Sequence, residues 1–143
     1  MATYQTVTAA DRIDVTPHLA KAHDALRAAA VLRDAGLHAD SVTRSHQACI
    51  HAERALLATE KLTPADGRGV HRMAANHFLQ GRDFEPPHLA AVERLAVLRT
   101  RADDVPASVV GADDAADSIS AATAVVGAIE TWLASNGYLG AAK

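Results

Sequence analysis

The sequence predicts an all-α protein, an antiparallel bundle of about five helices in one domain. Its 143 residues lie within the size range of a single compact domain. Alanine accounts for 33 of these residues, and alanine is the best helix former and a poor strand former. Gly, Pro and Asn residues divide the chain into helix-length segments in which apolar residues recur every three or four positions.

The first two predicted helices cover residues 16–35 and 40–59. Thr16 offers an N-cap, Pro17 suits the first helical position, and Gly36 can end the first helix in a left-handed turn. The second helix carries a stripe of apolar and small residues at alternating steps of three and four, namely Val42, Ser45, Cys49, Ala52, Leu56 and Thr59.

Three further helices follow. A turn at residues 63–67 precedes a short third helix that begins at Val70 and ends near Gly81. Pro86 and Pro87 begin the fourth helix, which reaches about Ala102. The fifth helix begins around Asp113 and Asp114, where carboxylates suit the positive end of the helix dipole, and ends at Asn136 and Gly137. The domain is therefore expected over residues 16–135, between an N-terminal segment (1–15) and a C-terminal tail (136–143) that is loose from Tyr138 onward.

Composition excludes several classes of protein. No stretch of about 18 uninterrupted apolar residues exists, so no membrane span is expected. The first 14 residues lack a basic segment followed by an apolar one, which argues against a secretory signal. A single cysteine, Cys49, allows no internal disulfide, and a cytoplasmic location is expected. The net charge of −3 and the 3% aromatic content argue against a general nucleic-acid binder.

The eight histidines are the one chemical excess in the chain. A metal site on a bundle helix needs ligands three or four residues apart, and no two histidines have that spacing. The only Glu-x-x-His, from Glu85 to His88, is interrupted by two prolines. We therefore expect no local metal site and no cofactor, while a histidine-based metalloprotein assembled from distant residues stays an alternative.

Three segments together resemble a known family. Residues 44–57 have the sequence Arg-Ser-His-Gln-Ala-Cys-Ile-His-Ala-Glu-Arg-Ala-Leu-Leu. This is similar to the signature helix of small HEPN proteins, Arg-Ala-Tyr-Tyr-Ala-Met-Phe-His-Ala-Ala-Arg-Ala-Leu-Leu. Gly69-Val70 with residues 76–78, and then residues 98–103, match further family features in the same order. The resemblance covers roughly residues 16–135.

The resemblance implies a bundle of about five helices, usually homodimeric, that acts on RNA or nucleotides. Many HEPN proteins are ribonucleases, often toxins paired with a minimal nucleotidyltransferase antitoxin, and others bind nucleotides or partners without catalysis. The ribonucleases carry an arginine, a polar residue and, a few residues later, a histidine. The arginine neutralises the scissile phosphate, and the histidine manages the protons for attack by the 2′-hydroxyl.

In the matching register, Arg99 stands at the arginine, Thr100 at the polar position and Asp104 where the histidine would be. An aspartate is normally ionised and carries the wrong charge beside a phosphodiester. His46 and Gln47 also replace the family's paired tyrosines. We therefore expect a module directed to RNA or nucleotides whose ribonuclease activity has decayed.

The candidate site is built around Arg99 and His51 as the residues expected to carry any remaining catalysis. His51 and Arg44 stand at family-matched positions seven residues apart, which places them near one face of their helix. The expected substrate- or nucleotide-binding residues are Arg44, His46, Thr100, Asp103 and Asp104. The alternative is a helical interaction protein without a ligand, in which His51 is a hydrogen-bonded bundle histidine and Arg44 a surface arginine.

Overall fold

The computed structural model describes residues 14–79, 83–106 and 109–139, and all regular structure in these ranges is helical. The elements are α1 (Thr16–Asp34), α2 (His38–Ala58), α3 (Gly67–Ala74), the π-helical turn η1 (Ala75–Leu79), α4 (Pro86–Asp104) and α5 (Ala112–Ser135). The predicted all-α fold with five helices is confirmed over the described residues.

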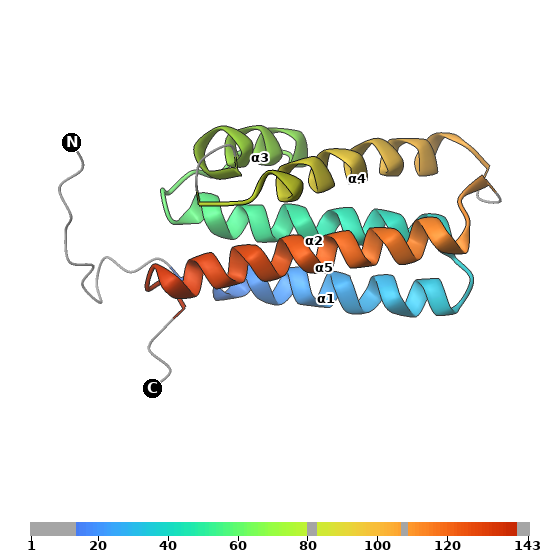
Figure 1. The fold of residues 1–143 in the computed structure, drawn as a ribbon, viewed down its shortest axis with the longest axis horizontal. Helices are drawn as coiled ribbons and strands as arrows, with labels where there is room; N and C mark the ends of the chain where they lie inside the picture. The colour runs from blue at the N-terminus through green and yellow to red at the C-terminus, as the bar shows by residue number, and fades with distance from the viewer. Residues whose placement is uncertain (1–13, 80–82, 107–108, 140–143) are drawn as a thin grey trace.

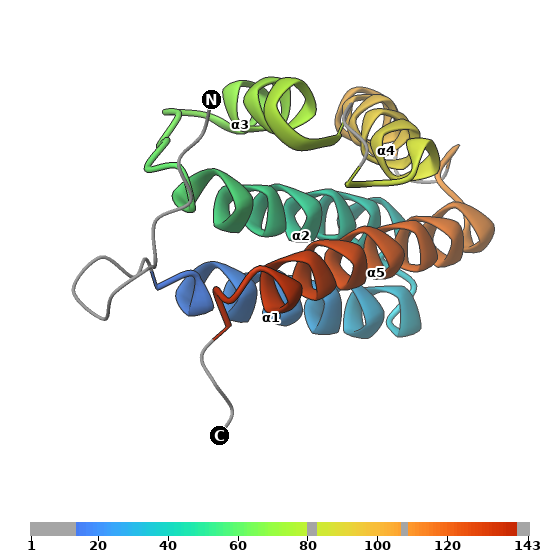
Figure 2. The same cartoon turned by 60° about the vertical axis from the view of Figure 1, so that its left-hand side comes forward.

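The helix α2 lies at the centre of the bundle. It contacts α1, α3, α4 and α5, and Figures 1 and 2 show α3 and α4 on one side of it and α1 on the other. In Figure 1, α1 and α4 run from left to right, whereas α2 and α5 run back. The four long helices α1, α2, α4 and α5 therefore alternate in direction along the chain, as in an antiparallel bundle.

Small side chains allow this central position. Of the 21 residues of α2, eleven are buried, and they include Ala48, Ala52 and Ala55 among larger residues such as Leu56 and Leu57. Alanine lets neighbouring helices approach closely, while the leucines fill the space between them. The main core continues from α2 into the buried faces of α1 and α5.

Two helices begin earlier than the sequence predicts. Helix α2 begins at His38 instead of Asp40, since the chain turns directly out of α1 through Gly36, whose φ is 80°. Helix α3 begins at Gly67 instead of Val70, because the Asp66 carboxylate caps it by accepting a hydrogen bond of 2.8 Å from the backbone of Gly69. The expected third helix also changes geometry, and its second half is the π-helical turn η1. Its expected end near Gly81 lies outside the described residues.

The predicted ends of the other helices are close to the observed ones. Gly137, with a φ of 83°, follows the end of α5 as expected for a left-handed C-terminal turn. At the other end of α5, the Asp114 carboxylate accepts a hydrogen bond of 3.0 Å from the backbone of Gly111. Helix α4 extends two residues beyond Ala102, to Asp104.

The start of the expected loose tail is packed instead. Tyr138 stacks on Trp132 with a centroid distance of 6.2 Å, and Phe78 meets the same indole edge-on at 5.4 Å. Tyr138 and Leu139 both pack against the main core. Aromatic stacking thus fixes the chain as far as Leu139, and residues 1–13 and 140–143 of the expected terminal segments lie outside the described residues.

The helix α5 is long and apolar enough to cross a membrane by length and composition alone. Its buried residues, including Val126, Ile129 and Leu133, belong to the core shared with α1 and α2. Its outward face carries acidic residues such as Asp113 and Asp117. These features are those of a core helix in a bundle.

The packing around α2 gives a first prediction. Leu56→Ala removes a fully buried side chain from the centre of the core and is expected to lower the free energy of unfolding by about 2–5 kcal/mol. Val31→Ala, at a side chain that is 67% exposed on α1, serves as the control and is expected to change it by less than about 0.5 kcal/mol. Urea unfolding of the two variants measures both values, and equal effects would contradict the central role of α2.

Candidate functional site

A cavity of about 310 Å³ lies among α2, α3 and α4. Helix α2 contributes one residue to its lining, and α3 and α4 contribute three each. The lining residues are His46, Gly67, Arg68, His71, Ala96, Arg99 and Thr100. Two arginines and two histidines from three separate helices therefore face one small space.

His46 and Arg99 form one side of the cavity. The Arg99 guanidinium donates a hydrogen bond from Nη1 to Nδ1 of His46 over 3.2 Å. An arginine has only hydrogens to give, so His46 accepts at Nδ1 and its remaining hydrogen is on Nε2. Burial, followed by the charges of Arg99 and His71, lowers the pKa of His46 from 6.5 to about 4. His46 is therefore neutral at physiological pH.

His71 and Glu53 form the other side. Glu53 lies on α2 with a fully buried side chain, and its Oε2 accepts a hydrogen bond of 2.8 Å from Nδ1 of His71. This hydrogen bond raises the pKa of His71, and Glu93, whose Oε2 lies 3.6 Å from His71 Nε2, adds to the increase. Burial raises the pKa of Glu53, and the bond from His71 opposes that shift. The pair therefore retains its protons to a higher pH than two separate groups would.

The charges around the cavity favour an anion. Arg68 and Arg99 are permanently cationic, and His71 adds positive charge when it is protonated. Asp103, one helical turn after Arg99, lies 3.9 Å from the Arg99 Nε and is 58% exposed, so it screens the guanidinium only weakly. Convergent guanidinium and imidazolium donors are a common arrangement for binding phosphate.

The comparison with known families agrees with this chemistry. The sequence model of the HEPN domain family matches residues 15–132. The chain belongs to the HEPN family. No curated protein and no solved structure matches it. The matched range includes α1 to α4 and most of α5, so the whole cavity lies within this HEPN domain, and the family as a whole is associated with RNA and nucleotides.

The structure of this HEPN domain brings together part of the predicted site. His46, Arg99 and Thr100 line the same cavity, and Asp103 lies beside Arg99. The Thr100 hydroxyl donates to the backbone oxygen of Ala96 over 3.1 Å. The residues that the resemblance selected on α4 and at His46 of α2 thus lie together at one side of the cavity.

Three other predicted residues are not in the cavity lining. His51 follows His46 by five residues, which places the two side chains about 140° apart around α2. Burial, followed by the charges of Lys21 and Arg54, lowers the pKa of His51, so its electrostatic neighbours differ from those of the cavity. Arg44 is exposed and donates to Gln47 over 3.3 Å.

Asp104, the third of these residues, is exposed at the last position of α4. It occupies the position of the family's histidine in the sequence but is not among the residues that line the cavity. A carboxylate in this position stays in contact with water. The family motif therefore contributes its arginine and its polar residue to the cavity, and no histidine.

Three residues of the site were missed in the sequence. Arg68 and His71 lie on α3, and the residue pattern of the sequence does not show that this helix packs against α2. Glu53 did give a signal, because it replaces an alanine of the family pattern inside a stripe of buried positions. It also follows His46 by seven residues and so lies on the same face of α2. A charged residue at such a position needs a partner, and a search for that partner could have found the histidine.

Metal binding was the third hypothesis raised by the histidine content. In the described ranges, no group of three or more His, Cys, Asp or Glu side chains is placed to hold a metal ion. Cys49 is buried, and burial raises the pKa of its thiol, with the nearby charge of Glu53 adding to the effect. The thiol therefore behaves as a small apolar side chain.

The pKa of His46 gives a second prediction, on stability. Its folded-state pKa of about 4 lies below the ordinary 6.5, so the unfolded chain binds the proton more tightly. The contribution of neutral His46 to the free energy of unfolding is fully present above about pH 6.5 and is lost as the pH falls toward 4. The variant His46→Gln keeps an acceptor for Arg99 but cannot take up this proton. Between pH 6.5 and pH 4 its free energy of unfolding is therefore expected to fall by about 2–3 kcal/mol less than that of the wild type.

Urea unfolding from pH 7 down to pH 4 measures this effect, with His77→Gln on the exposed turn η1 as the matched control. The control is expected to follow the wild-type profile. A His46→Gln variant that lost as much stability as the wild type on acidification would contradict the assigned ionisation of His46.

Proposed function

We propose that this HEPN domain is an RNA- or nucleotide-directed module that binds phosphate in the cavity of Arg99, Arg68, His46 and His71, with decayed ribonuclease activity. The observation that carries the proposal is the convergence of Arg99 with a second arginine and two histidines in one small cavity. Arg99 also stands at the position of the family's phosphate-neutralising arginine. The same convergence weighs against a ligand-free helical scaffold, which has no need of such a cluster.

Two features support the loss of cleavage. The exposed Asp104 cannot act as the missing histidine, since its carboxylate repels the scissile phosphate and is a weak base. His46 already uses its Nδ1 lone pair to accept from Arg99. Any residual catalysis would depend on Arg99, with His51 and Arg44 taking part only if RNA extended from the cavity to their face of α2.

The partner and location belong to the same proposal. The family resemblance points to a toxin–antitoxin pair with a nucleotidyltransferase, and the single cysteine, Cys49, favours the cytoplasm. A HEPN subunit without ribonuclease activity would then act by holding RNA or nucleotide for that partner. Co-purification with a nucleotidyltransferase encoded beside this chain tests the pairing directly.

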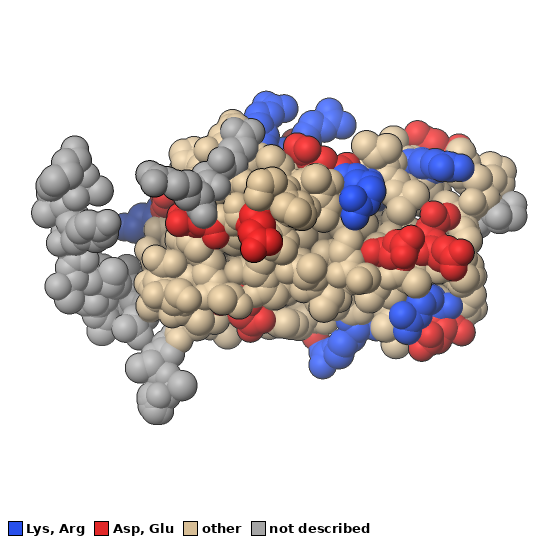
Figure 3. Space-filling model, viewed as in Figure 1, with Lys and Arg blue, Asp and Glu red and all other residues tan. Residues whose placement is uncertain are grey.

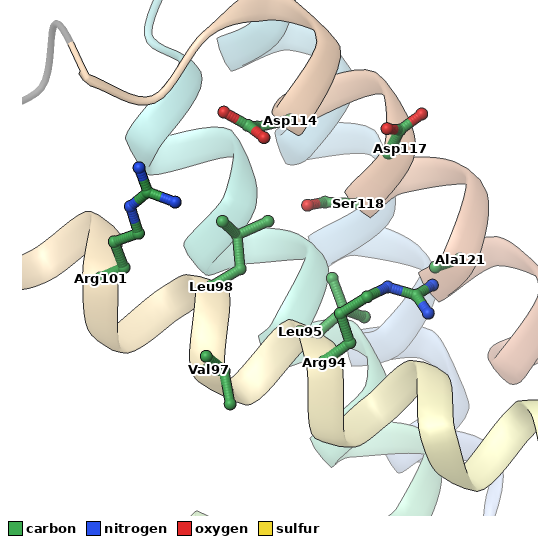
Figure 4. Close-up of a pocket in the computed structure, with 9 residues that line it drawn as sticks. All are labelled: Arg94, Leu95, Val97, Leu98, Arg101, Asp114, Asp117, Ser118 and Ala121. Carbon is green, nitrogen blue, oxygen red and sulfur yellow. The ribbon is translucent and has the colours of Figure 1, made fainter.

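A second copy of the chain is the partner that we propose for a groove between α4 and α5. HEPN domains commonly dimerise, and this groove of about 270 Å³ has Val97, 71% exposed, at its edge. Figure 4 shows Arg94 and Arg101 on the α4 side and Asp114 and Asp117 on the α5 side. Within the described residues these arginines form no ion pair of their own, so a two-fold arrangement can pair each set with its opposite on the other copy.

The surface charge elsewhere is consistent with a local phosphate site. On the face shown in Figure 3, blue and red side chains are interspersed over the described residues. A face of this kind does not follow a phosphate backbone over a long distance. RNA binding would therefore depend on the cavity and show a shallow salt dependence.

Arg99→Ala is expected to reduce affinity for a fluorescent single-stranded RNA about tenfold or more, because it removes the charged donor on which the cavity is centred. Fluorescence anisotropy measures this loss. Arg101→Ala removes the same charge two residues away on α4, outside the cavity, and is expected to leave the affinity within about twofold. RNA is expected to stay intact in EDTA. Metal-independent cleavage that disappears in Arg99→Ala and His51→Ala would contradict decayed activity.

Val97→Asp is expected to break the homodimer by placing a charge on the exposed apolar edge of the groove, within the proposed contact. In analytical ultracentrifugation the wild type should sediment at twice the protomer mass of 15.0 kDa and the variant at the protomer mass. Val31→Asp, at an exposed position of α1, is the control that should stay dimeric. A monomeric wild type at all concentrations would exclude this use of the groove.

A further inference from the structure

The buried pair of Glu53 and His71 needs an explanation beyond packing. The Glu53 side chain is fully buried in the central helix, and burial of a carboxylate costs several kcal/mol that even a well-placed partner does little more than offset. Its Oε1 has no hydrogen-bond partner among the described residues. An apolar residue, such as the alanine of the family pattern, would fill this position at lower cost. The pair is therefore better understood as a device that controls His71.

The pair controls whether the second ring nitrogen of His71, Nε2, carries a hydrogen. Nδ1 is held by Glu53, and Nε2 is buried without a hydrogen-bond partner in the part of the chain that is described. While the pair of Glu53 and His71 holds two protons, one of them is on Nε2 of His71. The other is on Nδ1 of His71 or on Oε2 of Glu53, and Nε2 keeps its hydrogen in both cases. His71 lines the cavity next to Arg99 and Arg68, so a ligand that displaces the Glu93 carboxylate can reach this unused donor.

The surrounding charges select among anions. Glu53 and His46 face His71 from α2, Arg68 lies on its own helix, and Glu93 and Arg99 approach from α4. Glu93 is the competitor of any ligand, because its carboxylate lies 3.6 Å from Nε2. A ligand with two negative charges displaces a single carboxylate more readily than a ligand with one.

The size of the cavity adds to this selection. A terminal phosphate can enter a compact space of about 310 Å³ from one side and present three oxygens to Arg99, Arg68 and His71. An internal phosphodiester has only two free oxygens, and the RNA chain continues from it in both directions, so the cavity would have to accommodate the chain on both sides of the phosphate. A phosphate monoester therefore matches the donors better in number, charge and access.

We propose that His71, held by Glu53, makes this cavity selective for a phosphate monoester, carried by an RNA end or by a free nucleotide, over internal phosphodiesters. This inference rests on the proposed function and goes beyond it by naming the ligand group and the residues that select it. Arg99 and Arg68 supply charge to either kind of phosphate. Glu53 does not contact the ligand and acts as a positioning residue.

The test compares short oligoribonucleotides of one sequence with a phosphate at the 5′ end, at the 3′ end or at neither end. Fluorescence anisotropy is expected to show about tenfold tighter binding for a phosphorylated end, the gain from one additional charged hydrogen bond. Competition by a mixture of the four nucleoside monophosphates, against the four nucleosides, identifies a free nucleotide as the source. A phosphate-dependent gain without such competition identifies the RNA end.

The pH profile connects the gain to His71. The ligand becomes a dianion above about pH 6, and Nε2 loses its hydrogen as the pH rises through the raised pKa of His71. The gain is therefore expected to be greatest near neutral pH and to disappear as the pH rises through the raised pKa of His71. His71→Gln should abolish it, and Glu53→Gln should move its loss to lower pH. The affinity of each variant for RNA without a terminal phosphate is measured in parallel and is the baseline from which its gain is calculated.

His77→Gln is the matched control, because His77 also faces a glutamate, Glu60, at 3.3 Å, but on the surface. It should keep the full gain. If one variant fails to fold by circular dichroism, the other still tests the assignment. Equal binding of all three RNAs without competition by the monophosphates would overturn the selectivity and leave the proposed function intact. Absence of binding to every RNA and nucleotide would overturn the proposed function itself.

Discussion

The position of α2 between four other helices is the constraint on which the rest of the molecule depends. A helix with so many neighbours tolerates few polar side chains, and a buried charged group is costly without a partner. Ser41 does so locally, by donating to the backbone oxygen of Ala29 in α1 over 2.7 Å. Glu53 does so at long range, through the hydrogen bond to His71 that ties α3 to α2. The contact that satisfies the core therefore also builds one side of the cavity.

The sequence was sufficient for the fold wherever the determinants are local. Alanine content, helical periodicity and the turn at Gly36 act within a few residues, and the five helices follow from them. The errors come where a boundary depends on something else. The Asp66 carboxylate extends α3 backward to Gly67 through a single hydrogen bond, and aromatic contacts with Trp132 hold Tyr138 in place. The π-helical turn η1 stands where a continuation of the third helix was expected, and the spacing of apolar residues does not distinguish the two geometries.

The site was predictable only in part, for a similar reason. Family resemblance along one helix led to Arg99 and Thr100, and to His46 on another, and these residues do share the cavity. It also favoured His51, although five residues of helix separate it from His46 by about 140°. The contribution of α3 could not be predicted, because the contact between Glu53 and His71 joins two helices whose relative placement no local pattern specifies. The isolated charge of Glu53 on a buried stripe was the one clue available.

The protonation states of His46 and His71 favour binding of an anion over cleavage of RNA, which is the basis of the proposed function. Cleavage of RNA by a 2′-hydroxyl needs a base with a free lone pair close to the phosphate. His46 is neutral but gives its Nδ1 lone pair to Arg99, and His71 keeps its protons through Glu53. Neither ring therefore has a free lone pair while these bonds and protons are kept. This supports the proposal that the cavity binds an anionic oxygen without cleaving RNA. The exposed carboxylate of Asp104 lies outside the cavity lining and does not supply such a base.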